Sequence, residues 1–288
     1  ALCASVDGTK IYAAFQQSGN RTTVLPASQA PDQPAPTNPN LPAPPKTALI
    51  VDASDSRIHY TVLDNDVAEI STTTQTVVRY LCDVATTLFN VAARPGTDEI
   101  WVPNTEALNR TRFEPVLNGH FADNRITRIA LTTPTVTPFD LNPGVDYHTL
   151  PNPTAQATAL AQPMGMVFSS DGATGWVAAF ASDRVAKVDP ATGAVVSRVD
   201  VRTSGNTKNM RGPRGLALDE VGGRLFVLNK LSNTITIINT ATLEIVNEVP
   251  TGSHDPTPIE IKEGRGFLFD ARLSGNGTMS CGTCHIDA

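Results

Sequence analysis

The sequence has few charged residues, few aromatic residues and no long hydrophobic run. Of its 288 residues, 17 % are charged and 6 % are aromatic, and the formal net charge is −6. Proteins that bind nucleic-acid phosphates need clustered basic side chains, and no basic run occurs here. No apolar stretch approaches the ~18–20 residues that cross a bilayer. We therefore expect neither a nucleic-acid partner nor a transmembrane segment in this chain.

The sequence also lacks an initiator methionine and a signal peptide. Residues 1–8 already have the pattern of a strand and its turn, so we expect that preceding residues were removed or not included. Cysteine is scarce, at four residues, and two of them lie close together near the end of the chain. The other two, Cys3 and Cys82, can form a disulfide in an oxidising compartment or stay separate as buried thiols.

Turn-forming and β-branched residues are abundant by contrast. With 22 prolines, 20 glycines and 40 % hydrophobic residues, the chain can build a core from short strands joined by tight turns. Pro163–Thr192 and Pro213–Thr242 align without gaps over most of their length, at an offset of fifty residues. Self-similarity at this period is typical of propellers and solenoids.

Each of these two units contains four short apolar segments separated by turn residues. Asp171-Gly172 and Gly222-Gly223 follow the first segment, and Ser182-Asp183 and Ser232-Asn233 follow the second. Glycine adopts a positive φ readily, and Asp and Asn side chains bond to their own backbone, so all four pairs predict tight turns. Four short antiparallel strands form one propeller blade. We therefore predict an all-β fold, a β-propeller of four-stranded antiparallel blades over residues 1–252.

Two further units are degenerate. The first is expected at Ala1–Leu25, and the second at Leu88–Leu131, where Thr105–Asp123 is interpreted as an insertion. Proline-rich insertions at residues 26–46 and 133–163 are expected to be long loops on the propeller face, because such stretches are extended and cannot pack a core. A recognition segment is the alternative for the first. At least four blades are visible, so we expect a propeller that is incomplete at the N-terminus.

Aromatic residues recur at one position of the pattern. Trp101, Trp176 and Phe226 are expected at equivalent second-strand positions. Because side chains alternate along a strand, Val177 and Val227 should point the opposite way. If Phe226 is buried between blades, its replacement by Ala should cost roughly 3–5 kcal/mol.

The repeats resemble the YVTN-type propellers of secreted bacterial and archaeal proteins over about residues 1–252. The residues that carry the resemblance are Ser170-Asp-Gly with Trp176-Val-Ala, and Val188-Asp-Pro-Ala-Thr-Gly-Ala-Val-Val196. The long proline-rich insertions depart from that family. The resemblance implies a propeller outside the cytoplasm, and long loops on such a rigid ring are where ligands usually bind.

The end of the chain contains Cys281-Gly-Thr-Cys284-His285. C-x-x-C-H is the motif of covalent c-type haem attachment, in which both thiols join the haem and the adjacent histidine becomes the proximal iron ligand. A zinc site, a thioredoxin-like redox pair and a structural disulfide are the alternatives. Adjacent Cys284 and His285 cannot easily face one tetrahedral metal, and no βαβ pattern precedes the motif. We therefore expect haem c as the cofactor, bound by Cys281, Cys284 and His285.

The residues before this motif resemble the entry to the haem domains of the diheme cytochrome c peroxidase and methylamine-utilisation-type family. The match covers about residues 262–288. The matching residues are Gly264, Leu268, Phe269, Leu273, Ser274, Gly277, Ser280, Cys281, Cys284 and His285. We accordingly interpret residues 253–288 as a linker and the start of a cytochrome c-like domain, with a short helix over residues 264–273 that places Phe267, Leu268 and Ala271 on one side. The resemblance also implies a missing C-terminal region, or another chain, that completes the haem pocket.

The remaining histidines and the methionines are weak candidates for a second iron ligand. His59, His120 and His148 lie among polar and turn residues and are expected at the surface. His254 could swing toward the iron, Met279 is too close to the motif, and Met210 would have to be supplied by the propeller. We therefore predict that the distal face stays open or is filled from outside residues 1–288.

These observations predict a periplasmic or extracellular c-type haem protein in electron transfer or peroxidase-like redox chemistry. The propeller would serve as the docking platform, and a redox partner protein is expected. The alternatives are an extracellular binding or cell-surface scaffold with an accessory haem, and a unit of a multi-haem electron-transfer assembly. No catalytic residue can be assigned.

Overall fold

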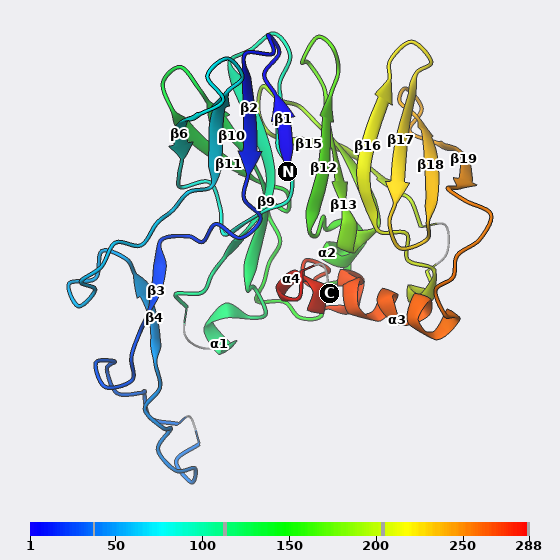
Figure 1. The fold of residues 1–288 in the computed structure, drawn as a ribbon. Helices are drawn as coiled ribbons and strands as arrows, with labels where there is room; N and C mark the ends of the chain where they lie inside the picture. The colour runs from blue at the N-terminus through cyan, green and yellow to red at the C-terminus, as the bar shows by residue number, and fades with distance from the viewer. Residues whose placement is uncertain (37, 112–113, 203–204, 287–288) are drawn as a thin grey trace.

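The computed structural model describes residues 1–36, 38–111, 114–202 and 205–286, and antiparallel strands dominate it. Four sheets, numbered 1 to 4 here in chain order, stand side by side, and short helices lie below them (Figure 1). The all-β prediction and the prediction of four-stranded antiparallel sheets are confirmed. The arrangement is that of a β-propeller-type fold.

Sheets 3 and 4 follow the two aligned repeats. Sheet 3 contains β12 (Pro163–Phe168), β13 (Gly175–Ala179), β14 (Arg184–Val188) and β15 (Val195–Asp200). Sheet 4 contains β16 (Pro213–Asp219), β17 (Arg224–Asn229), β18 (Thr234–Asn239) and β19 (Ile245–Pro250). Asp183 and Asn233 occupy equivalent turns with φ of 53° and 54°. Both adopt the left-handed conformation that Asp and Asn tolerate, as the turn prediction requires.

Sheet 1 corrects the sequence analysis. Its strands are β1 (Leu2–Ala4), β2 (Lys10–Ala14), β5 (Val67–Ser71) and β6 (Val77–Leu81). The prediction of a complete unit within Ala1–Leu25 is wrong, because a long insertion separates the second strand from the third. That insertion contains β3 (Thr22–Leu25) and β4 (Leu49–Asp52), which pair as a two-stranded ribbon that projects away from the sheets (Figure 1). The proline-rich segment connects these two strands, as a loop.

Sheet 2 is also more regular than its sequence indicates. It contains β7 (Thr87–Leu88), β8 (Ala92–Ala93), β9 (Glu99–Ala107), β10 (Ala122–Ala130) and β11 (Thr135–Asp140). Long strands β9 and β10 extend into both ends of the predicted insertion, and α1 (Glu114–Leu117) lies between them. Residues 133–163 are not a loop throughout. Pro138 lies in β11, an edge strand, where a missing N–H is tolerated, and α2 (Pro153–Thr158) follows.

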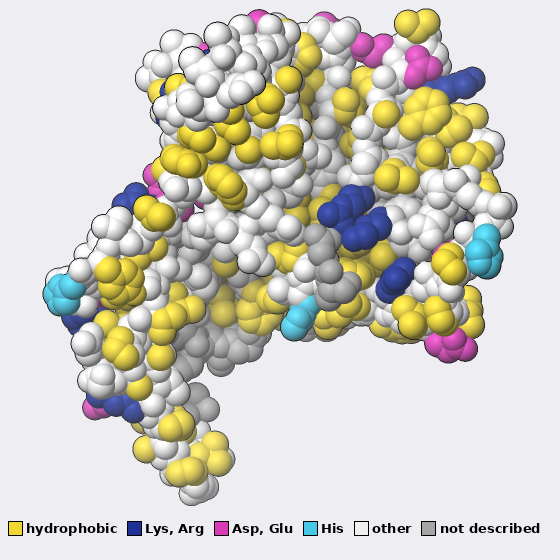
Figure 2. Space-filling model, viewed as in Figure 1, with side chains coloured by type: hydrophobic (Ala, Val, Ile, Leu, Met, Phe, Trp, Pro, Cys, Tyr) yellow, Lys and Arg dark blue, Asp and Glu magenta, His cyan; other side chains and the backbone are white. Residues whose placement is uncertain are grey.

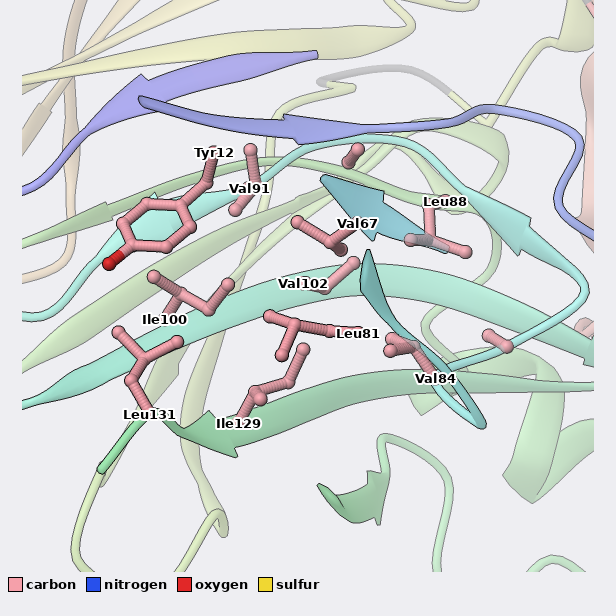
Figure 3. Close-up of a cluster of buried hydrophobic side chains, with 12 residues drawn as sticks. Tyr12, Val67, Leu81, Val84, Leu88, Val91, Ile100, Val102, Ile129 and Leu131 are labelled. Atoms are coloured by element: carbon pink, nitrogen blue, oxygen red, sulfur yellow. The ribbon is translucent and has the colours of Figure 1, made fainter. Parts of the chain in front are cut away.

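Three clusters of buried hydrophobic side chains fill the junctions between neighbouring sheets. Figure 3 shows the first, where Tyr12 of sheet 1 meets Ile100 and Val102 of sheet 2. Trp101 lies in the second cluster, between sheets 2 and 3, together with Val177. Because neighbours along β9 and β13 face opposite junctions, the predicted alternation is confirmed.

Phe226 differs from its two equivalents. Trp101 and Trp176 are 0 % and 2 % exposed, and Trp176 lies in the third junction with Val227. Phe226 occupies the matching place in β17 but is only half-buried, since it lies on the outer face of sheet 4. The expectation that Phe226 is buried between blades is therefore wrong within the described chain, where no fifth sheet follows.

Candidate haem attachment site

The end of the chain forms three short helical segments beneath the sheets. These are α3 (Ile259–Phe269), the 3₁₀ turn η3 (Ala271–Leu273) and α4 (Cys281–Cys284). They lie at the same end of the molecule as α2 (Figure 1). In the described part of the chain, no helix is long and apolar enough to cross a membrane.

Helix α3 begins earlier and ends earlier than predicted. It starts directly after Pro258, a residue that suits the start of a helix, and it ends before Asp270, whose extended backbone redirects the chain. The buried side is also different, because Phe267 is 53 % exposed while Phe269 is buried. The Phe269 ring contacts Phe180 edge-on, with centroids 5.3 Å apart. This contact fixes α3 against the loops of sheet 3.

Helix α4 brings the three predicted site residues together. Cys281 and Cys284 are three residues apart, so their side chains lie on one side of the helix. Both thiols are exposed and unpaired. His285 follows as the C-terminal cap, with an exposed side chain and a backbone N–H that donates to the Cys281 carbonyl at 3.0 Å. Two accessible thiols and an accessible imidazole thus leave the fold at one point.

The backbone around α4 is held close to the propeller. Asn124 of β10 donates its side-chain N–H to the Thr278 carbonyl at 3.0 Å. Gln162, which precedes β12, donates to the Gly282 carbonyl at 3.4 Å. The Phe269 ring occupies the space where a side chain at position 282 would lie, so only glycine permits this close approach. The attachment helix is therefore seated on sheets 2 and 3 rather than tethered by a loose linker.

A buried ion-pair cluster anchors the same segment to sheet 3. Arg202, which follows β15, lies 3.2 Å from the Asp183 carboxylate and 2.7 Å from the Asp270 carboxylate, and all three side chains are at most 2 % exposed. Burial raises the pKa of Asp183 to about 6, and a hydrogen bond from the Gly212 N–H opposes this rise. Sequence reasoning missed this cluster, because Arg202 and Asp270 are 68 residues apart.

A second anchor lies next to it. Arg272 of η3 pairs with Asp200 at 2.7 Å and donates to the Ser182 carbonyl at 3.0 Å through Nε. Gln156 of α2 donates to the Ser274 carbonyl at 2.5 Å. Both contacts join the segment before α4 to sheet 3 and its entry helix. The only indication in the sequence is that Arg272 adjoins Leu273 and Ser274 of the haem-domain resemblance.

The histidines outside the motif are not all simple surface residues. His59, His148 and His254 are exposed, as expected. His120 is instead half-buried, stacks on Tyr147 with ring centroids 3.6 Å apart, and lies 2.6 Å from the Asp123 carboxylate. Tyr147 in turn bonds to Thr278, and burial raises its pKa to about 12. The structure therefore places an aromatic pair beside the segment that leads into α4.

The sulfur-containing residues outside the motif are also placed. Met210 is buried with Phe180 and Phe269, and Met279 is 7 % exposed. Cys3 and Cys82 are free, so they remain separate thiols. Cys3 is half-buried, and its burial raises the pKa of the thiol to about 11, whereas Cys82 is exposed.

The residues on α4 fit covalent haem attachment by their chemistry. Thioether formation needs two free, accessible thiols, and proximal ligation needs an imidazole beside them; Cys281, Cys284 and His285 satisfy both. A zinc site needs four protein or water ligands in a tetrahedron. Across the described ranges, no group of three or more His, Cys, Asp and Glu residues could hold a metal ion. A porphyrin would supply the remaining ligands itself.

Comparison with solved structures supports the fold. The chain is similar to a hydrazine synthase structure from Kuenenia stuttgartiensis, with a TM-score of 0.51 and 17 % identity over 84 % of this chain and 71 % of that chain. It is also similar to a 6-phosphogluconolactonase-like protein from Bacteroides uniformis, with a TM-score of 0.48 and 15 % identity over 86 % of this chain and 56 % of that chain. A third likeness is AztD from Citrobacter koseri, with a TM-score of 0.42 and 12 % identity over 86 % of this chain and 59 % of that chain.

At these identities the likeness concerns the fold alone. No family model and no curated protein matches the sequence. The solved structures have β-propeller-type folds. The chain is therefore similar to β-propeller-type proteins in its architecture.

Proposed function

We propose that this chain is an extracytoplasmic c-type haem protein that acts in electron transfer or peroxidase-like redox chemistry. One observation carries the proposal. The two thiols of Cys281 and Cys284 and the imidazole of His285 are exposed together on a short helix that is fixed to a rigid fold. A c-type haem, once attached, supplies one-electron redox chemistry at its iron. The resemblance of residues 262–288 to the diheme peroxidase and methylamine-utilisation-type family supports the same role.

The protein residues have distinct tasks in this proposal. Cys281 and Cys284 form the two thioether links, and His285 binds the iron through its ring. Asn124 and Gln162 hold the backbone of the attachment helix, so the position of the haem is set by sheets 2 and 3. Seating on rigid elements is how proteins control the orientation and potential of a cofactor.

The propeller acts here as the docking platform for a redox partner protein. The ion pairs of Arg202 and Arg272 join the haem segment to sheet 3, so a partner bound on the propeller is held at a fixed position relative to α4. A fixed position matters, because electron transfer requires donor and acceptor to be held close. Haem c maturation also occurs outside the cytoplasm, so this proposal includes a periplasmic or extracellular location.

The proposal is tested by expressing the chain in a host with the haem c maturation machinery. We expect Soret and α bands that remain with the polypeptide after acid-acetone extraction. Cys281→Ser and Cys284→Ser should each weaken or abolish covalent attachment, while the matched control Cys82→Ser, at an exposed thiol elsewhere, should keep it. Haem that extracts fully from the unmodified chain, or equal loss in the Cys82 variant, would refute the assignment.

The distal face of the iron distinguishes the two kinds of redox chemistry. Met210 and Met279 are buried and His254 is exposed on a separate segment, so we infer that none of them binds the iron. The reduced holoprotein should then bind carbon monoxide with a shifted Soret band. His254→Ala and Met210→Leu should leave the spectrum unchanged. A spectrum of two strong axial ligands that either substitution disturbs would contradict this inference and favour simple electron transfer.

A further inference from the structure

Sheet 4 ends the row with an apolar outer face. Leu228 pairs with Ile235 across β17 and β18, and Phe226 pairs with Ile237, so these four side chains lie on one surface of the sheet. Leu228 is 46 % exposed. We call this surface, defined by Phe226, Leu228, Ile235 and Ile237, the leading face. Figure 2 shows hydrophobic side chains gathered in this region, over β17 and β18.

Sheet 1 has a second apolar surface at the other end of the row. Ile11 pairs with Ile70 across β2 and β5, and Leu2 pairs with Ala13 across β1 and β2. Leu2 is 71 % exposed and Ile11 is 36 % exposed. We call this surface, defined by Leu2, Ile11, Ala13 and Ile70, the trailing face. Hydrophobic side chains also gather over β1 and β2 in Figure 2.

The internal junctions show what covers such faces. On the leading side, the second strands of sheets 1, 2 and 3 present Tyr12, Trp101 and Trp176, each at most 2 % exposed under the next sheet. On the trailing side, Ile100 of sheet 2 and Leu225 of sheet 4 are fully buried against the preceding sheet. Phe226 and Ile11 occupy the matching positions of the two uncovered faces. The complement of each end face is therefore the other end face.

We propose that a second copy of this chain covers both faces, so that two copies close one ring of eight sheets. A two-fold rotation sets the leading face of each copy against the trailing face of the other, and closed cyclic symmetry leaves neither face open. Propellers contain typically 4–8 blades. One copy leaves the ring open, and three copies would exceed this range, so the dimer is the closed solution.

The area involved is sufficient for a stable dimer. A strand of about six residues spans roughly 20 Å, and four strands span roughly 19 Å, so each face has a footprint of about 380 Å². Two junctions would cover four such faces, about 1,500 Å². Stable protein–protein interfaces bury about 1,200–2,000 Å². The faces are thus large enough and apolar enough to hold two copies together.

Sedimentation velocity over a range of concentrations tests this proposal. We expect the 30.5 kDa chain to sediment as a dimer. Leu228→Glu and Ile11→Glu, which each place a charge in both junctions of the dimer, should weaken association by at least about tenfold. The matched control Val221→Glu, at a fully exposed turn outside both faces, should leave the dimer intact. Circular dichroism of each variant checks that the strands remain folded.

Mixing the two variants gives the sharpest result. The Leu228→Glu chain keeps its trailing face, and the Ile11→Glu chain keeps its leading face, so the mixture has one intact junction that neither variant has alone. We expect the mixture to form heterodimers. An unmodified chain that stays monomeric, that forms open polymers, or whose variants associate alone as well as mixed would overturn the proposal. The readout involves no haem, so it is independent of the proposed redox function.

Discussion

Replacing Arg202 by Ala removes the cation that holds the haem segment on sheet 3. The guanidinium lies between two buried carboxylates, 3.2 Å from Asp183 and 2.7 Å from Asp270. Removing one partner of a buried ion pair typically costs about 3–5 kcal/mol, because the remaining charge stays buried without compensation. Thr207 still donates to Asp270 at 3.0 Å, and this hydrogen bond reduces the penalty. We therefore expect Arg202→Ala to lower the free energy of unfolding by about 3 kcal/mol at pH 8.

The same variant should depend on pH in a defined direction. Burial already raises the pKa of Asp183 to about 6, and loss of the nearby guanidinium raises it further. A carboxyl whose pKa is higher in the folded state than in the unfolded state stabilises the fold below its unfolded pKa and loses that contribution as pH rises through the folded pKa. The destabilisation by Arg202→Ala should therefore be smaller at pH 5 than at pH 8.

Urea unfolding followed by tryptophan fluorescence measures this effect, since Trp101 and Trp176 are both buried. The matched control is Arg211→Ala, which breaks a partly exposed pair with Glu248 at 2.8 Å and should cost only about 1 kcal/mol. Equal losses for Arg202→Ala and the control would refute the buried-charge argument. So would a loss for Arg202→Ala that is the same at both pH values, which would indicate lost packing instead.

Three further substitutions test the packing and the electrostatics. Trp176→Ala should cost about 3–5 kcal/mol in urea unfolding, whereas Phe226→Ala in the monomeric state should cost less than half as much, because only the tryptophan is fully covered; equal costs would contradict the assigned faces. Burial raises the pKa of Asp66 to about 6, so Asp66→Asn should raise the melting temperature at pH 8 and not at pH 4, with a gain on the order of 1–3 kcal/mol; a loss at pH 8 would show that the charge is needed. Gly282→Val should lower thermal stability and haem attachment together, because the Phe269 ring occupies the space of the new side chain; unchanged attachment would show that α4 is not fixed there.

Local patterns allowed the regular part of the fold to be predicted. The two repeats that form sheets 3 and 4 contain their turns and apolar segments within about forty residues, and Asp183 and Asn233 adopt the backbone that the turn prediction needs. Sheet 1 was assigned wrongly, because the insertion from Phe15 to Asp66 contains its own β-branched segments, and Thr22–Leu25 forms a strand of the separate ribbon. Strand propensity does not indicate which strand is the partner.

The candidate site shows the same division. Cys281, Cys284 and His285 are adjacent in sequence, so their meeting on α4 follows from local structure. The contacts that fix α4 join residues more than a hundred positions apart, such as Asn124 with Thr278, and no local pattern reports them. The seating of the haem segment on the propeller therefore had to come from the three-dimensional structure.

The most direct test of the central claim is mass spectrometry of the matured chain after trypsin digestion. Cleavage after Arg272 releases a peptide of residues 273–288 that contains Cys281, Cys284 and His285. We predict that this peptide carries the mass of one haem, bound through both cysteines, while peptides with Cys3 and Cys82 carry none. A peptide recovered with two free thiols or an internal disulfide from haem-replete cells would contradict the account.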